Sequence, residues 1–343
     1  MADVTVHGAG ILGLSAAWAC VKKGARVKII DPNGAASGSS GGIVGALAPH
    51  VPENWNSKKA FQLESLLMAE TFWREVEATG GTTSGYSRAG RIQPVMDDAA
   101  LDLAFRRSET ARELWQGKAD WTVERCPNDI WAPLTPTGWA IRDTLSAHLH
   151  PRKACLALVS ALASKGVPID PDGAEQGQVL WATGVDGLKR LSAEHSRAVG
   201  NGVKGQAALL QFDARFSPQI FAESVHIVPH QDGTVAIGST SEREYLEGAT
   251  TDQQLDNVVA TACAAVPALQ GATVVQRWAG VRPRARSRAP MLGHWPGKPG
   301  HFIANGGFKI GFGMAPKIAQ VMANLMLDNR NEIPKGFEVS ASF

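Results

Sequence analysis

The sequence predicts a mixed α/β fold in which a parallel βαβ unit is joined to a region of successive strands. The first observation is the order strand, glycine-rich turn, helix and strand over residues 3–31. The second is a series of three strand-like segments between residues 206 and 240, with an Asp-Gly hairpin signal between the last two. The third is the length of 343 residues, which is enough for about two domains.

The N-terminal unit carries the fingerprint of a dinucleotide-binding site. A β-rich run, Val4 to His7, leads into a turn containing Gly8, Gly10 and Gly13, and an apolar segment of helical length, Leu14 to Val21, follows. Gly8 allows the tight turn, Gly10 lets a pyrophosphate approach the backbone, and Gly13 lets the helix pack closely on the strand. The helix start offers free N–H groups and roughly half a positive charge to the phosphates.

An acidic residue completes this unit. A second β-branched run, Val27 to Ile30, ends at Asp31, near the spacing of about 20 residues expected for a carboxylate on an adenosine ribose. Residues 200–205 also match the glycine pattern, but a polar segment precedes them and a strand-like run follows. We interpret that second match as a flexible turn, so the sequence predicts one dinucleotide site.

Composition limits the function classes. The chain is 44% hydrophobic and 19% charged, with a formal charge of +2, so bulk charge gives no reason to expect nucleic acid as a partner. Its four cysteines are scattered, as in a reducing compartment, and no cluster has the spacing of metal ligands, so no metal is expected. The apolar run at residues 9–21 is too short to cross a bilayer, and its lysines follow it, unlike those of a signal peptide. We therefore expect a soluble cytoplasmic protein without membrane contact.

The remaining elements follow from local patterns. Residues 32–50 are too rich in small side chains to build a core. Because they continue into an apolar stretch, Ile43 to Ala48, we favour close approach to a bulky flat ligand over a linker. Apolar residues at helical spacing predict further helices over 60–78, 98–115, from Pro151 onward, over 252–266 and over 317–327. Short β-rich runs predict strands at 90–95, 138–142, 178–184, 207–212, 224–228, 234–238, 273–279 and 301–304. Residues 305–316 form a second glycine-rich turn before the last helix, which again presents backbone N–H groups to a ligand.

Taken together, the chain resembles the glycine oxidase / D-amino-acid oxidase family of FAD-dependent oxidoreductases. The matching segments occur in family order at residues 8–13, 36–42, 181–184, 204–206, 227–229, 278–283 and 311–316. The resemblance implies a Rossmann-like FAD-binding domain interleaved with an antiparallel-sheet substrate domain. It places residues 1–50, 142–200 and 276–343 in the first and residues 51–141 and 201–275 in the second. Family members usually carry a β-meander where this chain has only residues 167–177, so this edge of the FAD domain should be reduced.

The resemblance also implies an activity and a set of site residues. Family members pass a hydride from an amine carbon to FAD, and water hydrolyses the resulting imine. By position Arg282 clamps the substrate carboxylate, for which a planar guanidinium is suited, although an arginine in a surface ion pair is the alternative. Lys309 occupies a position where the family often has arginine. Lysine keeps the positive charge but cannot form the two parallel hydrogen bonds of a guanidinium. His226, where glycine oxidases tend to have tyrosine, is placed at the substrate too, although a lone strand histidine more often has only a structural role.

The FAD-binding residues implied by the same motifs come from four segments of the chain. They are Gly8, Gly10, Ile11, Gly13, Asp31, Ser37, Ser39, Gly42, Ile43, Ala182, Thr183, Gly184, Gly306, Gly307, Phe308, Lys309, Ile310 and Gly311. His50 could lie near the flavin ring, where covalent attachment occurs in the wider superfamily.

Four functions stay open at this point. The first is FAD-dependent oxidation of a small amino acid or secondary amine, which makes that small molecule the expected partner. The second is flavin-dependent modification of the tRNA wobble uridine, acting on an RNA-linked glycine-like group. It is implied by a resemblance: Arg284, Arg286 and Arg288 alternate, would share one face of an extended segment, and form a cluster similar to that of the flavin domain of the bifunctional tRNA wobble-uridine modifying enzymes. A solvated basic rim and the attraction of an acidic substrate are the other interpretations of these arginines. The third is an NAD-dependent dehydrogenase, which the C-terminal glycine-rich turn disfavours. The fourth is a nucleotide-binding protein without catalysis. The oligomeric state is not predicted.

Overall fold

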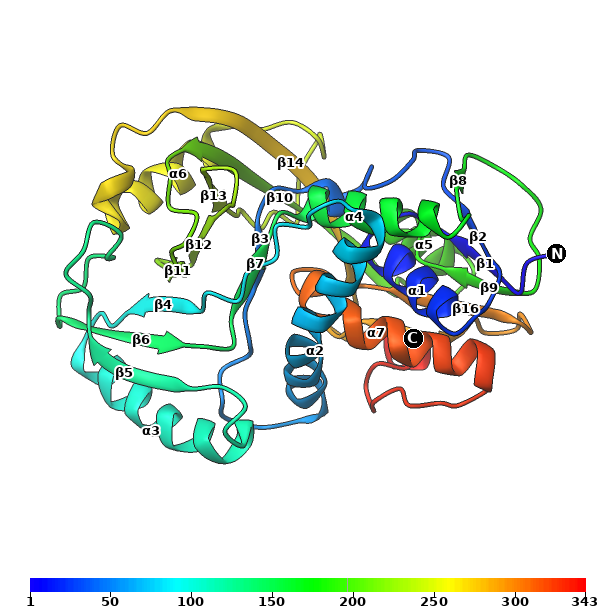
Figure 1. Cartoon of the computed structure of the whole chain (residues 1–343), viewed down its shortest axis with the longest axis horizontal. Coiled ribbons are helices and arrows are strands. Elements are labelled where there is room, and N and C mark those ends of the chain that lie inside the picture. Colours follow the sequence, from blue (N-terminus) through cyan, green and yellow to red (C-terminus); the bar gives the residue numbers. More distant parts are fainter. Residues whose placement is uncertain (196) are drawn as a thin grey trace.

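The computed structural model describes residues 1–195 and 197–343 and contains two large sheets (Figure 1). The smaller sheet has six strands in the order β15-β16-β9-β1-β2-β8. Their bounds are β1 (Val4–His7), β2 (Val27–Ile30), β8 (Ile169–Asp170), β9 (Gln178–Trp181), β15 (Met291–His294) and β16 (His301–Asn305). The five neighbours from β16 to β8 run parallel, and β15 pairs antiparallel at one edge. This is the predicted βαβ architecture.

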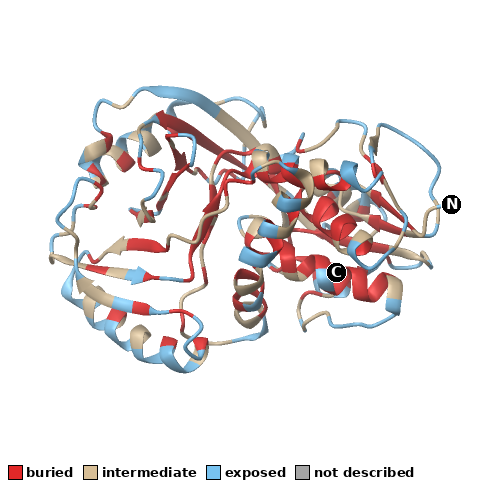
Figure 2. Cartoon of the chain, in the orientation of Figure 1, coloured by how far each residue is buried: buried red, intermediate tan, exposed pale blue. Residues whose placement is uncertain are grey.

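Helices cover the six-stranded sheet, and the side chains of its central strands are buried beneath them, Thr5 of β1 included. Val4 and Val6 of β1 are fully buried, as is the apolar face of α1 (Ile11–Lys22). Three more helices pack in this layer: α2 (Ser57–Gly80), α4 (Pro151–Ser164) and α7 (Gly311–Asp328). A shorter helix, α5 (Gly184–Ala193), follows β9 directly. Figure 2 shows the buried residues concentrated along α1 and α7 and along the strands that run between the two sheets.

The larger sheet has eight strands in the order β14-β10-β13-β12-β11-β4-β6-β5. Their bounds are β4 (Arg91–Pro94), β5 (Trp121–Arg125), β6 (Trp139–Asp143), β10 (Gly200–Gln211), β11 (Gln219–Ala222), β12 (Val225–Pro229), β13 (Thr234–Gly238) and β14 (Val274–Ala285). The pairs are antiparallel except β11 with β4. Helix α6 (Gln253–Ala265) packs on β10, β12 and β13, and α3 (Asp98–Trp115) packs on β5. The predicted fold class, a Rossmann-like domain with an antiparallel-sheet domain, is confirmed.

The longest strands differ from the sequence prediction. Residues 200–205, expected as a flexible turn, form the first half of β10. The reason is pairing: their backbone groups are paired with residues 280–285 of β14, which extends six residues beyond its predicted end at Ala279. The strand β5 and the helix α5 were not predicted. The predicted reduction at the edge of the FAD domain is present, because only the two-residue strand β8 lies between α4 and β9.

The sheets also bear on the predicted division of the chain. Residues 276–285 were assigned to the FAD domain, but they lie in β14 and therefore in the eight-stranded sheet. The helix α2, assigned to the substrate domain, packs on α4 and α7 beside the six-stranded sheet. We accordingly propose the same interleaved division with β14 moved to the substrate domain and α2 to the FAD domain. None of the helices in the described residues is long and apolar enough to cross a lipid bilayer.

A cluster of three buried histidines lies where a two-stranded sheet, β3 (Gly45–Leu47) with β7 (Ala147–Leu149), meets α4. His148 is in β7, His150 is the N-cap of α4, and the His230 ring lies 4.7 Å from that of His150. Burial lowers the pKa of His148 and His150 to about 4, and that of His230 to about 3. Both ring nitrogens of His148 are buried without a partner among the described residues. The folded chain therefore holds this cluster in the neutral form.

This cluster should make the fold sensitive to acid. A histidine in the unfolded chain binds a proton near pH 6.5, roughly, so between that pH and about pH 4 the unfolded state binds more protons than the folded state. The free energy of unfolding should consequently fall as pH drops through this window, by up to about 1.4 kcal/mol per pH unit for each histidine. We expect His148→Leu to reduce this slope in urea unfolding with FAD in excess, whereas a change of the exposed His294 to Asn should not. Parallel curves for wild type and His148→Leu would contradict the assignment.

Candidate cofactor and substrate site

A cavity of about 1290 Å³ lies at the carboxyl ends of the parallel strands and continues to the larger sheet. Residues that follow β1, β2, β9 and β16 line it, and so does the inner part of β14. Parallel strands place their carboxyl ends at one edge of a sheet, which is where α/β folds bind ligands. The predicted segments thus meet in one place although they are far apart in the sequence.

The turn between β1 and α1 has the shape that its glycines predict. Gly8 has a φ of +102°, and a Cβ there would lie 2.5 Å from the carbonyl oxygen of Ala182. A Cβ on Gly13 would lie 1.9 Å from the carbonyl oxygen of Gly8, so this residue serves helix–strand packing and does not line the cavity. Gly10 and Ile11 do line the cavity at the N-terminus of α1. The backbone is thereby exposed to a ligand where the helix dipole is positive.

Asp31 lies at the end of β2 and lines the same cavity. Its Oδ2 accepts the backbone N–H of Ala9 at 2.7 Å, and its Oδ1 accepts that of Asn33 at 2.9 Å. The carboxylate is therefore fixed against the glycine turn of β1. That it lies beside the adenosine end of a bound dinucleotide stays a prediction.

The small-residue segment after β2 wraps over the helix start. The predicted residues Ser37, Ser39, Gly42 and Ile43 all line the cavity. Sequence reasoning missed Ser40, whose Oγ accepts the N–H of Ile11 at 3.0 Å and which also lines the cavity. A serine inside a run of serines and glycines gives no signal of which hydroxyl reaches the helix.

The two remaining glycine-rich turns are tied to each other. Ala182, Thr183 and Gly184 line the cavity, and Asn305, which was not predicted, donates its Nδ2 hydrogen to the carbonyl of Gly184 at 2.8 Å. The Oδ1 of Asn305 accepts the N–H of Gly306 at 2.7 Å. One amide side chain therefore fixes the position of both turns.

Two of the predicted cofactor residues in the last glycine-rich turn lie outside the cavity lining. Gly307, Phe308, Lys309 and Gly311 line the cavity, but Gly306 and Ile310 do not. Gly306 turns the backbone at a φ of +71° against Ala285, and Ile310 is the N-cap of α7. Their roles are in backbone geometry and packing. His50 is likewise outside the cavity lining, since its ring contacts the side chain of Gln62.

Arg282 on β14 dominates the other end of the cavity. Its side chain is only 8% exposed, and its Nη2 donates to Ser239 Oγ at 2.8 Å and to the carbonyl of Thr240 at 3.2 Å. Its Nη1 is buried without a partner, and no carboxylate among the described residues pairs with it. Burial lowers the pKa of Arg282 to about 10, which leaves it charged at neutral pH. The alternative of a surface ion pair is therefore excluded by its burial.

His226 and Lys309 line the same end of the cavity. His226 lies on β12 with its ring 4.6 Å from that of Phe221. Burial, with the charges of Arg91, Lys309 and Arg282, lowers the pKa of His226 to about 3, so the imidazole is neutral. Desolvation at the cavity and the nearby guanidinium groups of Arg282 and Arg284 lower the pKa of Lys309 as well. This end of the cavity is positive, and its imidazole adds no charge.

The fold and the cavity are those of a dinucleotide-binding protein whose cleft ends beside a buried arginine that has no carboxylate partner among the described residues. The model of the FAD-dependent oxidoreductase family (DAO) matches residues 3–325, and the chain belongs to that family. Its cofactor is therefore FAD. The residues present fit that group, because a glycine-lined turn, a helix N-terminus and a cavity of sufficient volume lie together.

Individual proteins are similar to the chain, one over part of its sequence and others in fold. A glycine oxidase from Pseudomonas putida is 34% identical over 125 residues, which is 36% of this chain and 34% of that protein. The chain thus matches about a third of the length of that relative. The crystal structure of glycine oxidase from Geobacillus kaustophilus superimposes with a TM-score of 0.83 at 19% identity, covering 98% of both chains. Iminodiacetate oxidase from Chelativorans sp. BNC1 gives a TM-score of 0.84 at 24% identity, covering 96% of this chain and 97% of the other.

Asp31→Ala should weaken FAD retention. The substitution removes the acceptor that fixes the Ala9 N–H and the negative charge at the adenosine end. We expect the dissociation constant of FAD to rise about tenfold or more, the scale of a lost hydrogen bond to a charged group. The measurement is flavin absorbance per protein after gel filtration. Asp213→Asn, in an exposed ion pair with Arg215, is the control. An unchanged flavin content in Asp31→Ala would remove this residue from the site.

Proposed function

We propose that this chain oxidises a small amino acid or secondary amine, of the glycine oxidase or D-amino-acid oxidase type, by hydride transfer to FAD. FAD, when bound, supplies the ring that accepts the hydride. The protein then has to hold the substrate in alignment and keep water out. Arg282, charged, buried and without a carboxylate partner among the described residues, is the observation that carries the proposal.

The residues at the Arg282 end of the cavity have different roles in substrate binding. Arg282 keeps Nη1 free for a carboxylate, because Ser239 and Thr240 hold Nη2. We assign to Lys309 a supporting charge at the cavity mouth, since its side chain is exposed and cannot form two parallel bonds. The neutral His226 can make one hydrogen bond to the substrate and leaves its charge unaltered. Apolar lining residues, including Ile43, Val44, Ala207 and Trp278, limit water in the cavity.

The structure weakens the RNA alternative. The three arginines were expected to share one face of an extended segment, but β14 ends at Ala285. Arg288 has a φ of +61°, so the chain turns there and the alternation is interrupted. The guanidinium of Arg284 lies 5.4 Å from the centre of the Phe308 ring. Membership of an FAD-dependent family excludes the NAD-dependent alternative. The four cysteines are free, as in the reducing cytoplasm where we place the enzyme.

The substrate class can be tested on the holoenzyme. We expect anaerobic bleaching of the flavin by at least one member of a panel containing glycine, sarcosine, hydroxyproline and D-amino acids. Amines of similar size that lack a carboxylate should react far more slowly. Absorbance of the flavin is the measurement. Equal reaction of amines with and without a carboxylate would contradict a carboxylate-binding arginine.

Arg282→Ala should abolish this reduction while FAD stays bound. Removing one partner of a buried charged contact costs enough to lower the apparent second-order rate of flavin reduction by at least about 30-fold. Arg282→Lys should recover part of the loss, because it keeps the charge without the fork. Stopped-flow reduction and flavin content are measured together. If reduction is unaffected, the carboxylate binds elsewhere.

A further inference from the structure

We propose that the segment Lys204-Gly205-Gln206 of β10 is a positioning device for Arg282. In this proposal, which rests on the proposed function, Lys204 and Gln206, the outer residues of the segment, fix the position of the loop that holds the guanidinium. Its glycine makes room for that group, and Lys204 keeps Glu242 from pairing with it. Neither the fold nor the family description assigns a role to these residues.

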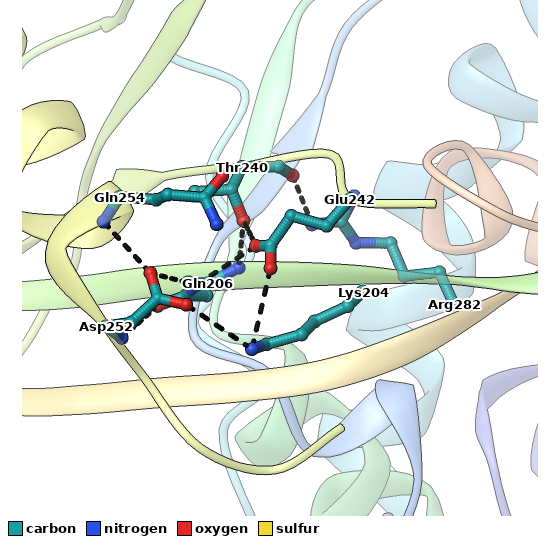
Figure 3. A network of polar contacts seen from close by, with 7 residues as sticks. All are labelled: Lys204, Gln206, Thr240, Glu242, Asp252, Gln254 and Arg282. Carbon is teal, nitrogen blue, oxygen red and sulfur yellow. Dashed lines mark hydrogen bonds and ion pairs between the residues drawn. The ribbon is translucent and has the colours of Figure 1, made fainter. Parts of the chain in front are cut away.

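The outer residues connect the two ends of one loop (Figure 3). Gln206 donates its Nε2 hydrogens to Glu242 Oε1 at 3.0 Å and to Asp252 Oδ1 at 2.9 Å, and its Oε1 accepts the N–H of Asp252 at 2.8 Å. Lys204 Nζ lies 3.5 Å from Glu242 and 3.8 Å from Asp252. The intervening residues 245 and 247–249 line the cavity. Holding residues 242 and 252 together therefore fixes a wall of the site.

The same loop begins with the groups that hold Arg282. The Oγ1 of Thr240 accepts the backbone N–H of Gln206 at 2.9 Å and donates to Glu242. The carbonyl of Thr240 and the Oγ of Ser239 are the acceptors for Arg282 Nη2. Any shift of Glu242 is thus passed through Thr240 to the guanidinium.

Gly205 faces the guanidinium directly. A Cβ at this position would lie 1.4 Å from Nη2 of Arg282 and 2.2 Å from its Cζ. Only glycine leaves Arg282 where the structure has it. The second glycine-rich match in the sequence therefore has a function, although it binds no dinucleotide.

The charges explain why Lys204 is needed. Lys204, Glu242 and Arg282 are 3%, 9% and 8% exposed, so all three charges lie out of bulk water. Both oxygens of Glu242 are occupied, one by Gln206 and Thr240 and the other by Lys204. A buried carboxylate that loses its cation is costly. Without Lys204, Glu242 would turn to Arg282 and compete with the carboxylate of the substrate.

Acetate binding to the holoenzyme tests this directly, with acetate as the simplest carboxylate and the flavin spectrum as the signal. We expect Lys204→Met to lower the affinity for acetate about tenfold or more. In the double variant Lys204→Met/Glu242→Gln the affinity should return to within about threefold of wild type, because the competing charge of Glu242 is gone. Lys204→Arg should bind as wild type. Asp256→Asn, which breaks the exposed pair of Asp256 with Arg277, is the matched control and should leave acetate affinity unchanged.

Several results would overturn the inference. If Lys204→Met binds acetate as wild type does, or if the double variant stays as weak as the single one, Lys204 does not protect Arg282. If Lys204→Met fails to load FAD, Gly205→Ala decides: unchanged acetate affinity in that variant refutes the proposal, and a loss supports it. The Arg282→Ala variant distinguishes a failure of the proposed function from a failure of the positioning role alone. If acetate binding does not depend on Arg282, the proposed function fails; if it does while the Lys204 and Gly205 variants behave as wild type, only the positioning role fails.

Discussion

A positive charge buried without a carboxylate partner is the constraint on which the site depends. Removing a guanidinium from water is costly unless hydrogen bonds and nearby charges offset the loss. For Arg282 the offset comes from Ser239, from the carbonyl of Thr240, and from the negative charge of Glu242, which lies close without touching it. The result is a cation that is held in place and still has one edge free. Such a group is stable in the fold and becomes better satisfied when an anion arrives.

The two long strands make this arrangement possible. β10 and β14 pair over their full length, and this pairing places Arg282 opposite the segment that contains Gly205. Near the end of β14, Arg284, which is still paired with Asn201 of β10, also bridges to Gly307 in the last glycine-rich turn. One pair of strands, which runs from the larger sheet toward the smaller one (Figure 1), therefore connects the end of the cavity that contains Arg282 with the last glycine-rich turn. A rigid connection of this kind suits an enzyme whose task is to align two bound molecules.

The sequence predicted those parts of the site that follow from local rules. A glycine that must have a positive φ, or that must let two backbones touch, leaves a mark at its own position, as Gly8 and Gly13 do. Ser40, Asn305 and the contacts of Glu242 leave none, because each depends on a partner far away in the chain. The strand at 200–205 was missed for the same reason, since its partner β14 lies some 80 residues later. Copying a family motif as a block also assigned Gly306 and Ile310 to the cavity, although only their neighbours line it.

The electrostatics of the site also bear on the protonation state of the amine that the proposed function requires. A substrate whose carboxylate rests on Arg282 brings its ammonium group near two positive side chains, Arg282 and Lys309, and near a neutral imidazole. Positive charges lower the pKa of a neighbouring ammonium group. They thereby favour the neutral amine, which is the form that can release a hydride from its carbon. His226 is compatible with this because its burial keeps it neutral. On the proposed function, the cations that bind the substrate's carboxylate also favour the neutral form of its amine. Keeping Glu242 away from Arg282 therefore preserves the positive charge that both effects require.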